Sequence, residues 1–223
     1  MLYRTLELTL APALRTAYRP LVTGTVNVPA SGPVIFAANH QSFADEFFIP
    51  LAARRQVFFF AKAEYFTSAG LRGKAMAAFF HGMGQVPVER GDTRSAASVI
   101  EIGVEVLGRG RALGIFPEGT RSPDGRLYKF RTGVARLAIR SGAPVVPVGV
   151  VGTRDVLPPN GRRWHRAPVE IHFGAPQHYG DVGDQERSVR VLREVTETIR
   201  REIEALCGQE FVDNYASSMK LAE

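Results

Sequence analysis

The sequence predicts a single α/β domain in which a mostly parallel sheet is flanked by helices. Short apolar runs of strand length alternate with longer segments whose apolar residues recur at helical spacing. The chain has 223 residues, of which 45% are hydrophobic and 22% charged, and this balance suits one globular domain with a sizeable core. Its single cysteine, Cys207, allows no intrachain disulfide bond.

Residues 1–20 are predicted to form an amphipathic helical segment. Its apolar stripe at helical spacing consists of Leu2, Leu6, Leu10, Ala13, Leu14 and Ala17. Pro12 lacks the N–H group that a helix interior needs, so we expect two short helices rather than one. The stripe fits an ordinary helix packed on the domain slightly better than an interfacial anchor with its apolar face in lipid.

Residues 21–207 are predicted to form the main domain. We expect strands at residues 22–28, 34–38, 57–61, 85–88, 112–116, 145–151 and 169–173. We expect helices at about residues 42–53, 64–80, 93–107, 133–141 and 184–207. Pro87 indicates that the run 85–88 is an edge or irregular strand, because proline donates no hydrogen bond to a sheet.

Two segments outside these elements have no regular pattern. Residues 154–166 are polar, basic and rich in proline, which predicts a surface loop. Residues 208–223 have weak signals of either helix or strand, so we expect a loosely attached C-terminal tail.

The carboxyl ends of the predicted strands bring chemically active residues to one rim of the sheet. In parallel α/β sheets, ligands bind outside these ends. The segments that follow directly on predicted strands are Asn39-His40, Lys62, Glu89-Arg90 and residues 117–121. We therefore expect a histidine and several cations to share this rim.

His40 and Asp45 are predicted to meet in the turn between a strand and a helix. In a continuous helix they would point about 140° apart, but a turn at Gln41 and Ser42 lets the carboxylate reach back to the imidazole. That pairing fixes the tautomer and makes the other ring nitrogen a better base. Ser42 and Asp45 also fit a simple helix-start signal, so this stretch alone favours a base and a cap equally.

A phosphate site beside such a base is the functional interpretation of the cations Lys62, Arg90 and Arg121. Arginine presents a rigid fork of donors that suits phosphate oxygens, and lysine is a compact charge. A base beside a phosphate site suits a hydroxyl group carried on a phosphorylated molecule. Lys62 alone fits a solvated surface charge better, whereas Arg90 and Arg121 together with His40 favour the phosphate site. The formal net charge of +6 also favours anionic partners, without choosing among them.

The three residues before Arg121 leave their role open. Gly119 permits a positive φ or a close approach of the backbone to a ligand. Thr120 can bond the backbone locally. Glu118 can orient Arg121, contact substrate hydroxyl groups or cap a neighbouring segment.

Four blocks of residues occur in a specific order and spacing. They are Asn39-His40-x-Ser42-x-x-Asp45, Gly84-x-Val86-Pro87-Val88-x-Arg90, Phe116-Pro117-Glu118-Gly119-Thr120-Arg121-Ser122 and Ala143-Pro144-Val145-Val146-Pro147-Val148. Together they resemble the blocks of the glycerolipid acyltransferase family typified by lysophosphatidic acid acyltransferase. The resemblance covers roughly residues 22 to 175, and four ordered blocks are far more specific than any one of them.

The resemblance implies an enzyme that acylates lysophosphatidic acid to phosphatidic acid. His40 would be the general base and Asp45 its orienting partner in the H-x4-D spacing, and the acceptor hydroxyl would attack the thioester of acyl-CoA or acyl-carrier protein. The acceptor phosphate would be held by Arg90, Arg121 and Lys62. The residues that would bind substrate or shape the site are Asn39, Ser42, Glu118, Gly119, Thr120 and Pro147. No cofactor and no metal are implied.

Other site patterns are missing from the sequence. It contains no phosphate-loop, dinucleotide or nucleophile-elbow motif, and the remaining histidines show no paired metal-ligand spacing. Its scattered arginines, not interleaved with aromatic residues, argue against a nucleic-acid partner. Two alternatives stay open. One is the same chemistry on another lysophospholipid or a lipid-linked sugar, suggested by the basic loop 154–166, and the other is a non-catalytic lipid- or phosphate-binding relative.

The expected location is the cytoplasm, at the inner face of the membrane. No apolar run approaches the ~20 residues that span a bilayer, and the N-terminal residues lack the pattern of a signal peptide. The expected partners are a lysophospholipid acceptor, an acyl donor and the membrane surface. Because an ordinary histidine has a pKa of about 6.5, His40 would be partly neutral near pH 7, and we expect a basic limb in the rate profile that disappears in His40→Ala.

Overall fold

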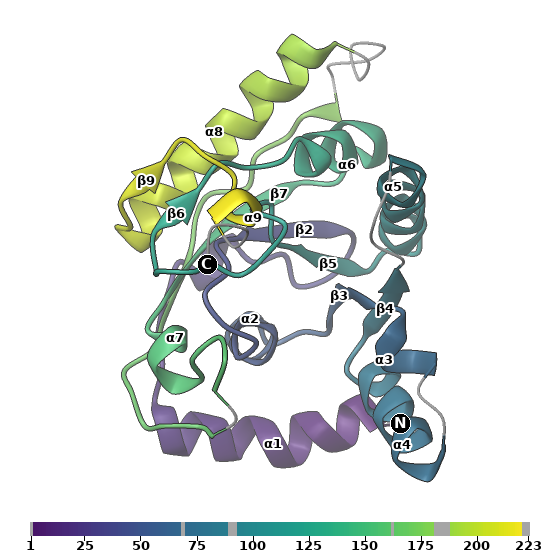
Figure 1. Cartoon of the computed structure of the whole chain (residues 1–223), viewed down its shortest axis with the longest axis vertical. Coiled ribbons are helices and arrows are strands. Elements are labelled where there is room, and N and C mark those ends of the chain that lie inside the picture. The colour runs from purple at the N-terminus through teal and green to yellow at the C-terminus, as the bar shows by residue number, and fades with distance from the viewer. Residues whose placement is uncertain (1, 68–69, 89–92, 162, 181–187, 220–223) are drawn as a thin grey trace.

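A seven-stranded sheet runs through the middle of the molecule, with helices on both of its faces (Figure 1). The computed structural model describes residues 2–67, 70–88, 93–161, 163–180 and 188–219. The strand order is β1-β8-β7-β2-β5-β3-β4, and the five strands from β7 to β4 are parallel to one another. The strands β8 and β1 run in the opposite direction at one edge. The predicted α/β fold with a mostly parallel sheet is confirmed.

The bounds of the elements are as follows. The main sheet contains β1 (Leu21–Thr23), β2 (Val34–Ala38), β3 (Val57–Lys62), β4 (Gln85–Val88), β5 (Ala112–Ile115), β7 (Val145–Val151) and β8 (Glu170–Phe173). A small second sheet pairs β6 (Leu127–Tyr128) with β9 (Phe211–Val212). The helices are α1 (Leu2–Tyr18), α2 (Asp45–Ala53), α3 (Glu64–Thr67), α4 (Gly70–Gly82), α5 (Thr93–Gly108), α6 (Gly133–Ser141), α7 (Thr153–Val156), α8 (Val189–Cys207) and α9 (Ala216–Met219), with a 3-10 turn η1 at Thr25–Asn27.

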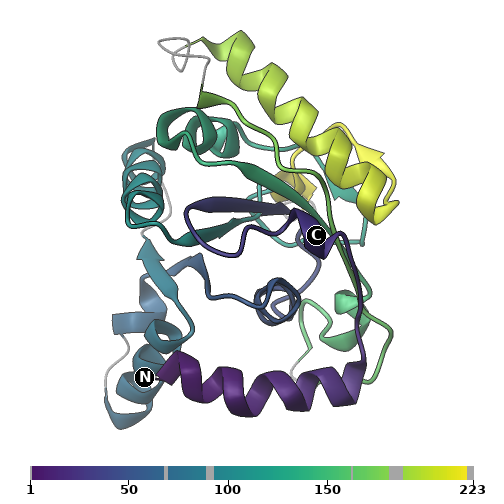
Figure 2. The ribbon, with the colours of Figure 1, turned by 180° about the vertical axis from the view of Figure 1, so that it is seen from behind.

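The central strands are buried on both faces, which explains why they read as continuous apolar runs. Phe36 and Val146 pack in the core on the side of α1 and α2, whereas Ile35 and Val145 pack in the core under α5, α6 and α8. Figures 1 and 2 show these two helical layers above and below the sheet. Alternate side chains of a strand point to opposite faces, so one apolar strand serves both cores.

The N-terminal segment is one helix and not the two that Pro12 predicted. Pro12 lies inside α1, which is one helix over Leu2–Tyr18. On the inner face of this helix, Leu14 is buried, and Leu10 and Tyr18 pack against the core beside α2. This packing holds the helix together across the one backbone bond that proline removes. None of the helices in the described residues is long and apolar enough to cross a membrane.

Several further boundaries differ from the prediction. The helix expected at 64–80 is described as two helices, α3 and α4, and the loop expected at 154–166 begins inside α7. The strand expected at 22–28 ends at Thr23, because Gly24 turns the chain with a φ of 66° into η1. A Cβ at Gly24 would lie 1.9 Å from the carbonyl oxygen of Phe173, so glycine is required at this turn. The helix expected from residue 42 begins at Asp45, because the chain completes its turn first.

The C-terminal segment is attached to the domain more firmly than its weak local signals predicted. Its strand β9 pairs with β6, and the backbone N–H of Lys129 donates to the carbonyl of Asn214 at 3.0 Å. The Lys129 ammonium forms an ion pair with Asp213 at 2.8 Å. Ala216 in α9 is fully buried. These contacts come from residues distant in sequence, so local propensity could not reveal them.

Candidate active site

The turn after β2 and the loop after β5 lie side by side at the carboxyl ends of the central strands. The two strands pair in parallel, with Ala37 opposite Ile115, so the chain leaves both at the same rim. The backbone N–H of His40 donates to Glu118 Oε2 at 2.7 Å, and the carbonyl of His40 accepts from the N–H of Ser122 at 2.8 Å. The first and third sequence blocks are therefore joined directly at His40.

His40 and Asp45 form a hydrogen-bonded pair within this turn. The His40 Nδ1–H donates to Asp45 Oδ2 at 2.8 Å, since an ionised carboxylate can only accept. Asp45 is fully buried in the first turn of α2, and the same Oδ2 accepts from the N–H groups of Gln41 at 2.8 Å and Ser42 at 3.0 Å. The positive end of a helix favours a negative charge at this position. The carboxylate is thus anchored by the turn that carries the histidine.

An aromatic ring fixes the plane of the His40 imidazole. The ring of Phe116 stacks on it with centroids 3.8 Å apart and planes 11° apart. Phe116 in turn stacks on Phe59 at 5.5 Å, in a space that Gly114 leaves open, because a Cβ there would lie 2.1 Å from the Phe59 ring. The face of an aromatic ring attracts a cation, so this stack favours the imidazolium that forms when a base takes up a proton.

Glu118 joins the His40 turn to the strand β6 rather than facing solvent. Its side chain is fully buried, with Oε2 bonded to His40 and Oε1 accepting from the N–H of Tyr128 at 3.0 Å. Burial raises the pKa of Glu118 to about 8, against the two backbone hydrogen bonds, which lower it. The adjacent Gly119 has a φ of 76°, a conformation that glycine adopts without strain.

Asn39 and Ser42 fix the backbone around the histidine. Asn39 is fully buried, with Nδ2 donating to the carbonyl of Val150 and to Gln209 Oε1, both at 2.8 Å, and with Oδ1 accepting from the N–H of Val150 at 2.7 Å. The buried hydroxyl of Ser42 donates to the carbonyl of Leu157 at 2.6 Å. These contacts show a bracing role, and substrate contact by either residue stays a prediction.

Of the three predicted cations, the structure describes the side chain of Arg121 alone. Arg121 donates from Nη1 to the carbonyl of Pro159 at 2.9 Å, which ties it to the basic loop. Lys62 ends β3, but its side chain lies outside the described part of the structure, and Arg90 lies outside the described residues altogether. Pro147 is buried inside β7, opposite Ala37 of β2.

Comparison with known proteins shows which family this chain matches. Residues 19–151, more than half of the chain, match the acyltransferase family model. The chain belongs to the acyltransferase family. The family predicted from the four sequence blocks is confirmed.

Two relatives of this acyltransferase family member are both named 1-acyl-sn-glycerol-3-phosphate acyltransferase. A chloroplastic 1-acyl-sn-glycerol-3-phosphate acyltransferase of Brassica napus is 36% identical over 142 residues, which cover 63% of this chain and 40% of that protein. An enzyme of the same name from Borreliella burgdorferi is 31% identical over 139 residues, covering 60% of this chain and 52% of the relative. The solved LPA acyltransferase PlsC of Thermotoga maritima superimposes with a TM-score of 0.68 and 27% identity, over 92% of this chain and 79% of that one.

Three side chains of this family member contact the His40 turn without having been predicted to do so. They are Phe116, which stacks on His40, Thr153, whose hydroxyl donates to Asp45 Oδ1 at 2.5 Å, and Gln209, which bonds to Asn39 and to the carbonyl of Gly125. Phe116 stands inside the third block, and its position beside Pro117 was the available signal. Thr153 and Gln209 are 108 and 170 residues away in sequence from their partners, so spacing gave no signal.

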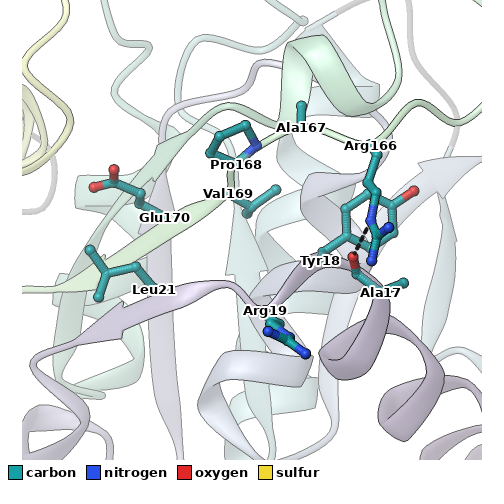
Figure 3. A pocket seen from close by; sticks show the side chains of 9 residues that line it. All are labelled: Ala17, Tyr18, Arg19, Leu21, Arg166, Ala167, Pro168, Val169 and Glu170. Carbon is teal, nitrogen blue, oxygen red and sulfur yellow. Dashed lines mark hydrogen bonds between the residues drawn. The ribbon is translucent and has the colours of Figure 1, made fainter.

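The acyltransferase domain also has an open pocket of about 460 Å³ at the corner formed by α1, β1 and β8. Figure 3 shows Arg19 and Arg166 beside the C-terminal end of α1, with Glu170 on the opposite side. Arg166 donates from Nε to the carbonyl of Ala17 at 3.0 Å. None of the residues of the His40 turn lines this pocket.

Proposed function

We propose that this protein transfers an acyl chain from a thioester donor to the hydroxyl group of 1-acylglycerol 3-phosphate, giving phosphatidic acid. The observation that carries the proposal is the His40–Asp45 pair, 2.8 Å long, with a fully buried and anchored carboxylate, in a member of the acyltransferase family. The choice of substrate in this proposal comes from the names of the relatives described above. Because the chain spans 40% of the length of the first of them, the activity is a proposal for this protein.

The proposed reaction is a direct transfer with His40 as general base. Nε2 of His40 takes the proton of the acceptor hydroxyl while that oxygen attacks the thioester carbonyl. Asp45 and the Phe116 ring stabilise the imidazolium that results. Collapse of the tetrahedral intermediate breaks the carbon–sulfur bond, and the imidazolium returns its proton to the leaving thiolate. No acyl-enzyme forms.

The acceptor phosphate is assigned to the cations at the rim. Arg121 uses one of its five N–H donors on Pro159, so a phosphate can take others. Arg90 and Lys62 are proposed as further ligands from their places in the sequence blocks, and Gly119, Thr120 and Pro147 as residues that shape the site. Glu118 acts in this proposal through the backbone that it holds.

The donor and the acceptor headgroup are separate parts of the proposal. Acyl-CoA and acyl-carrier protein both offer a thioester, and either serves the proposed chemistry without a cofactor. The contact between Arg121 and the basic loop favours one alternative, the same transfer to a lysophospholipid with a different headgroup, because Pro159 of that loop lies next to the proposed phosphate ligand. A panel of lysophospholipids measured with both donors separates these cases.

The test is acceptor-dependent thiol release. We expect wild-type protein to release thiol from a long-chain acyl-CoA, or from acyl-carrier protein, when lysophosphatidic acid is added. His40→Ala should lose at least about a hundredfold of this rate, the lower range for a general base. His172→Ala is the matched control, because it also removes a histidine paired with a carboxylate, and its rate should stay within about twofold. A His40→Ala variant with near wild-type turnover would refute the base, and no release with any donor and lysolipid would refute the transfer.

We also propose that α1 contacts the membrane surface from the cytoplasmic side. The exposed described residues of α1 are Thr5, Leu8, Thr9, Pro12, Ala13, Arg15, Thr16 and Ala17, so only one of them is charged. Arginines 19 and 166 at the end of this helix suit anionic headgroups (Figure 3). Leu8 is 76% exposed, and Leu8→Glu should weaken sedimentation with anionic vesicles several-fold, whereas Val26→Glu, at a site outside α1 that is 92% exposed, should not. Equal sedimentation of the two variants would remove α1 from the proposal.

A further inference from the structure

Thr153 contacts the base pair from outside the sequence blocks and outside the residues 19–151 that match the family model. It is fully buried, and its hydroxyl donates to Asp45 Oδ1 at 2.5 Å. Within the described part of the chain, Thr153 is the only side chain or backbone group that bonds to Oδ1, whereas Oδ2 accepts three N–H groups, from His40, Gln41 and Ser42.

The backbone places Thr153 firmly at this position. The strand β7 pairs in parallel with β2, so its end reaches the same rim as His40. Gly152 then turns the chain with a φ of 80°, and a Cβ there would lie 2.0 Å from the carbonyl oxygen of Pro168. Two bonds from Asn39 hold Val150 just before this turn. The short helix α7 therefore begins with Thr153 aimed at the aspartate.

The residues next to Thr153 connect α7 to the third sequence block and to the His40 turn. Arg154 donates from Nη1 to the carbonyl of Ser122 at 2.9 Å and from Nη2 to the carbonyl of Pro123 at 2.6 Å. Leu157 accepts the hydroxyl bond of Ser42. One turn of helix thus contacts the segment that carries Asp45 and the loop that carries Glu118.

We propose that Thr153 is a positioning residue that fixes the carboxylate plane of Asp45 and, through it, the imidazole ring of His40. The terminal torsion of an aspartate is broad and twofold, so the bonds to its oxygens decide the orientation of the carboxylate. The backbone N–H groups hold one oxygen, and the Thr153 hydroxyl holds the other. This inference rests on the proposed function only for its kinetic part, since the orientation of the ring is a property of the free protein.

The kinetic test compares Thr153→Val with two other variants. Valine keeps the shape of threonine and removes the donor, so kcat should fall about tenfold, the effect of one hydrogen bond to a charged group, while KM for donor and acceptor stays within about twofold. Thr153→Ser restores the donor and should recover most of the rate. Thr196→Val is the matched control, because Thr196 is another fully buried threonine, whose hydroxyl donates to the carbonyl of Leu192 inside α8.

The second readout does not require turnover. The titration of the His40 ring is followed by NMR without substrate, and its resonance is assigned by its loss in His40→Ala. Asp45 and Glu118 both contact His40, and a Glu118→Gln background removes the titration of Glu118. Without the Thr153 donor, more of the Asp45 charge faces the imidazole, so the midpoint should move to higher pH by at least about 0.3 in Thr153→Val.

The outcomes separate the two proposals. A displaced midpoint that returns in Thr153→Ser supports the positioning role even if no acyl transfer is found, in which case the proposed function alone fails. If Thr153→Val does not fold, Thr153→Ala removes the same donor without a second methyl group and must give the same displacement. A folded variant with unchanged midpoint and unchanged kcat overturns the inference, as does a Thr196→Val variant with the same effects.

Discussion

His40 donates to Asp45 at 2.8 Å just after β2, and His172 bonds to Glu170 at 3.0 Å within β8. By distance the two histidine–carboxylate pairs are nearly the same. By exposure the histidines also agree, with 13% of the His40 side chain and 17% of the His172 side chain accessible. The carboxylates differ, since Asp45 is fully buried and Glu170 is 41% exposed.

The surroundings of the carboxylates explain this difference. Asp45 accepts two backbone N–H groups and a threonine hydroxyl besides its histidine. The Glu170 carboxylate has, among the described residues, the bond to His172 alone. The other ring nitrogen of His172 is bonded to the hydroxyl of Thr23 at 2.8 Å on the neighbouring edge strand β1. This second pair therefore links β1 to β8.

A short His–carboxylate distance therefore does not by itself identify a general base. An ion pair with a solvent-exposed carboxylate contributes little, because solvent screens it and holding an exposed side chain in one geometry costs entropy. A buried carboxylate with every oxygen bonded can neither rotate nor rehydrate, so it orients the imidazole and stabilises its charged form. A general base also needs access to a ligand, and the position of His40 at the carboxyl ends of parallel strands provides it.

Changing the acid of each pair to its amide should affect the two pairs very differently. Asp45→Asn keeps the shape of the side chain but removes the charge that stabilises the His40 imidazolium. We expect kcat for acyl transfer to fall by roughly 10² to 10⁴, the range of general acid–base catalysis, with little change in KM. Glu170→Gln makes the same chemical change at the exposed pair, and its kcat should stay within about twofold.

Steady-state thiol release for the two amide variants, with circular dichroism to show that both are folded, checks this prediction. Comparable losses in both variants would mean that the buried surroundings of Asp45 do not distinguish the pairs. A small loss in Asp45→Asn alone would leave His40 as a base that does not depend on a charged partner.

Much of the His40–Asp45 pair could be predicted from the sequence because its two residues are close together in the chain. His40 and Asp45 are five residues apart, and a strand followed by a turn and a helix is readable from apolar spacing. The joining of Asn39-His40 to the loop at residues 117–122 followed from the rule that ligand sites lie at the ends of parallel strands. Ser42 was expected to cap the helix, and its hydroxyl does accept from the N–H of Ala44, although α2 begins later.

The remaining contacts could not be predicted because they join distant segments. Thr153 reaches Asp45, and Gln209 reaches Asn39, only after β7, β2 and α8 have packed together. Pro12 failed as a helix breaker for the same reason, since packing against the core outweighed its local preference. Glu118 was ambiguous in sequence because its role depends on burial, which no spacing rule reports.

Glu118, the second buried acid beside His40, should make the stability of the protein depend on pH. Burial raises its pKa from an ordinary 4.5 to about 8, so the folded protein holds a proton that the unfolded chain has released in this range. The stability that this group contributes is therefore complete below about pH 4.5 and is lost as pH rises through 8. The expected slope is at most about 1.4 kcal/mol per pH unit between these limits.

Glu118→Gln cannot titrate, so its free energy of unfolding should lack this slope. Its amide can accept from only one of the two N–H groups of His40 and Tyr128, and a buried N–H without a partner costs about 1–3 kcal/mol. We expect the variant to be less stable than wild type near pH 5, with a gap that narrows toward pH 8, in urea unfolding measured across this range. Glu170→Gln is the control, and its stability should run parallel to wild type because the Glu170 side chain is 41% exposed. If Glu118→Gln also runs parallel, Glu118 is ionised throughout, and its two backbone bonds outweigh its burial.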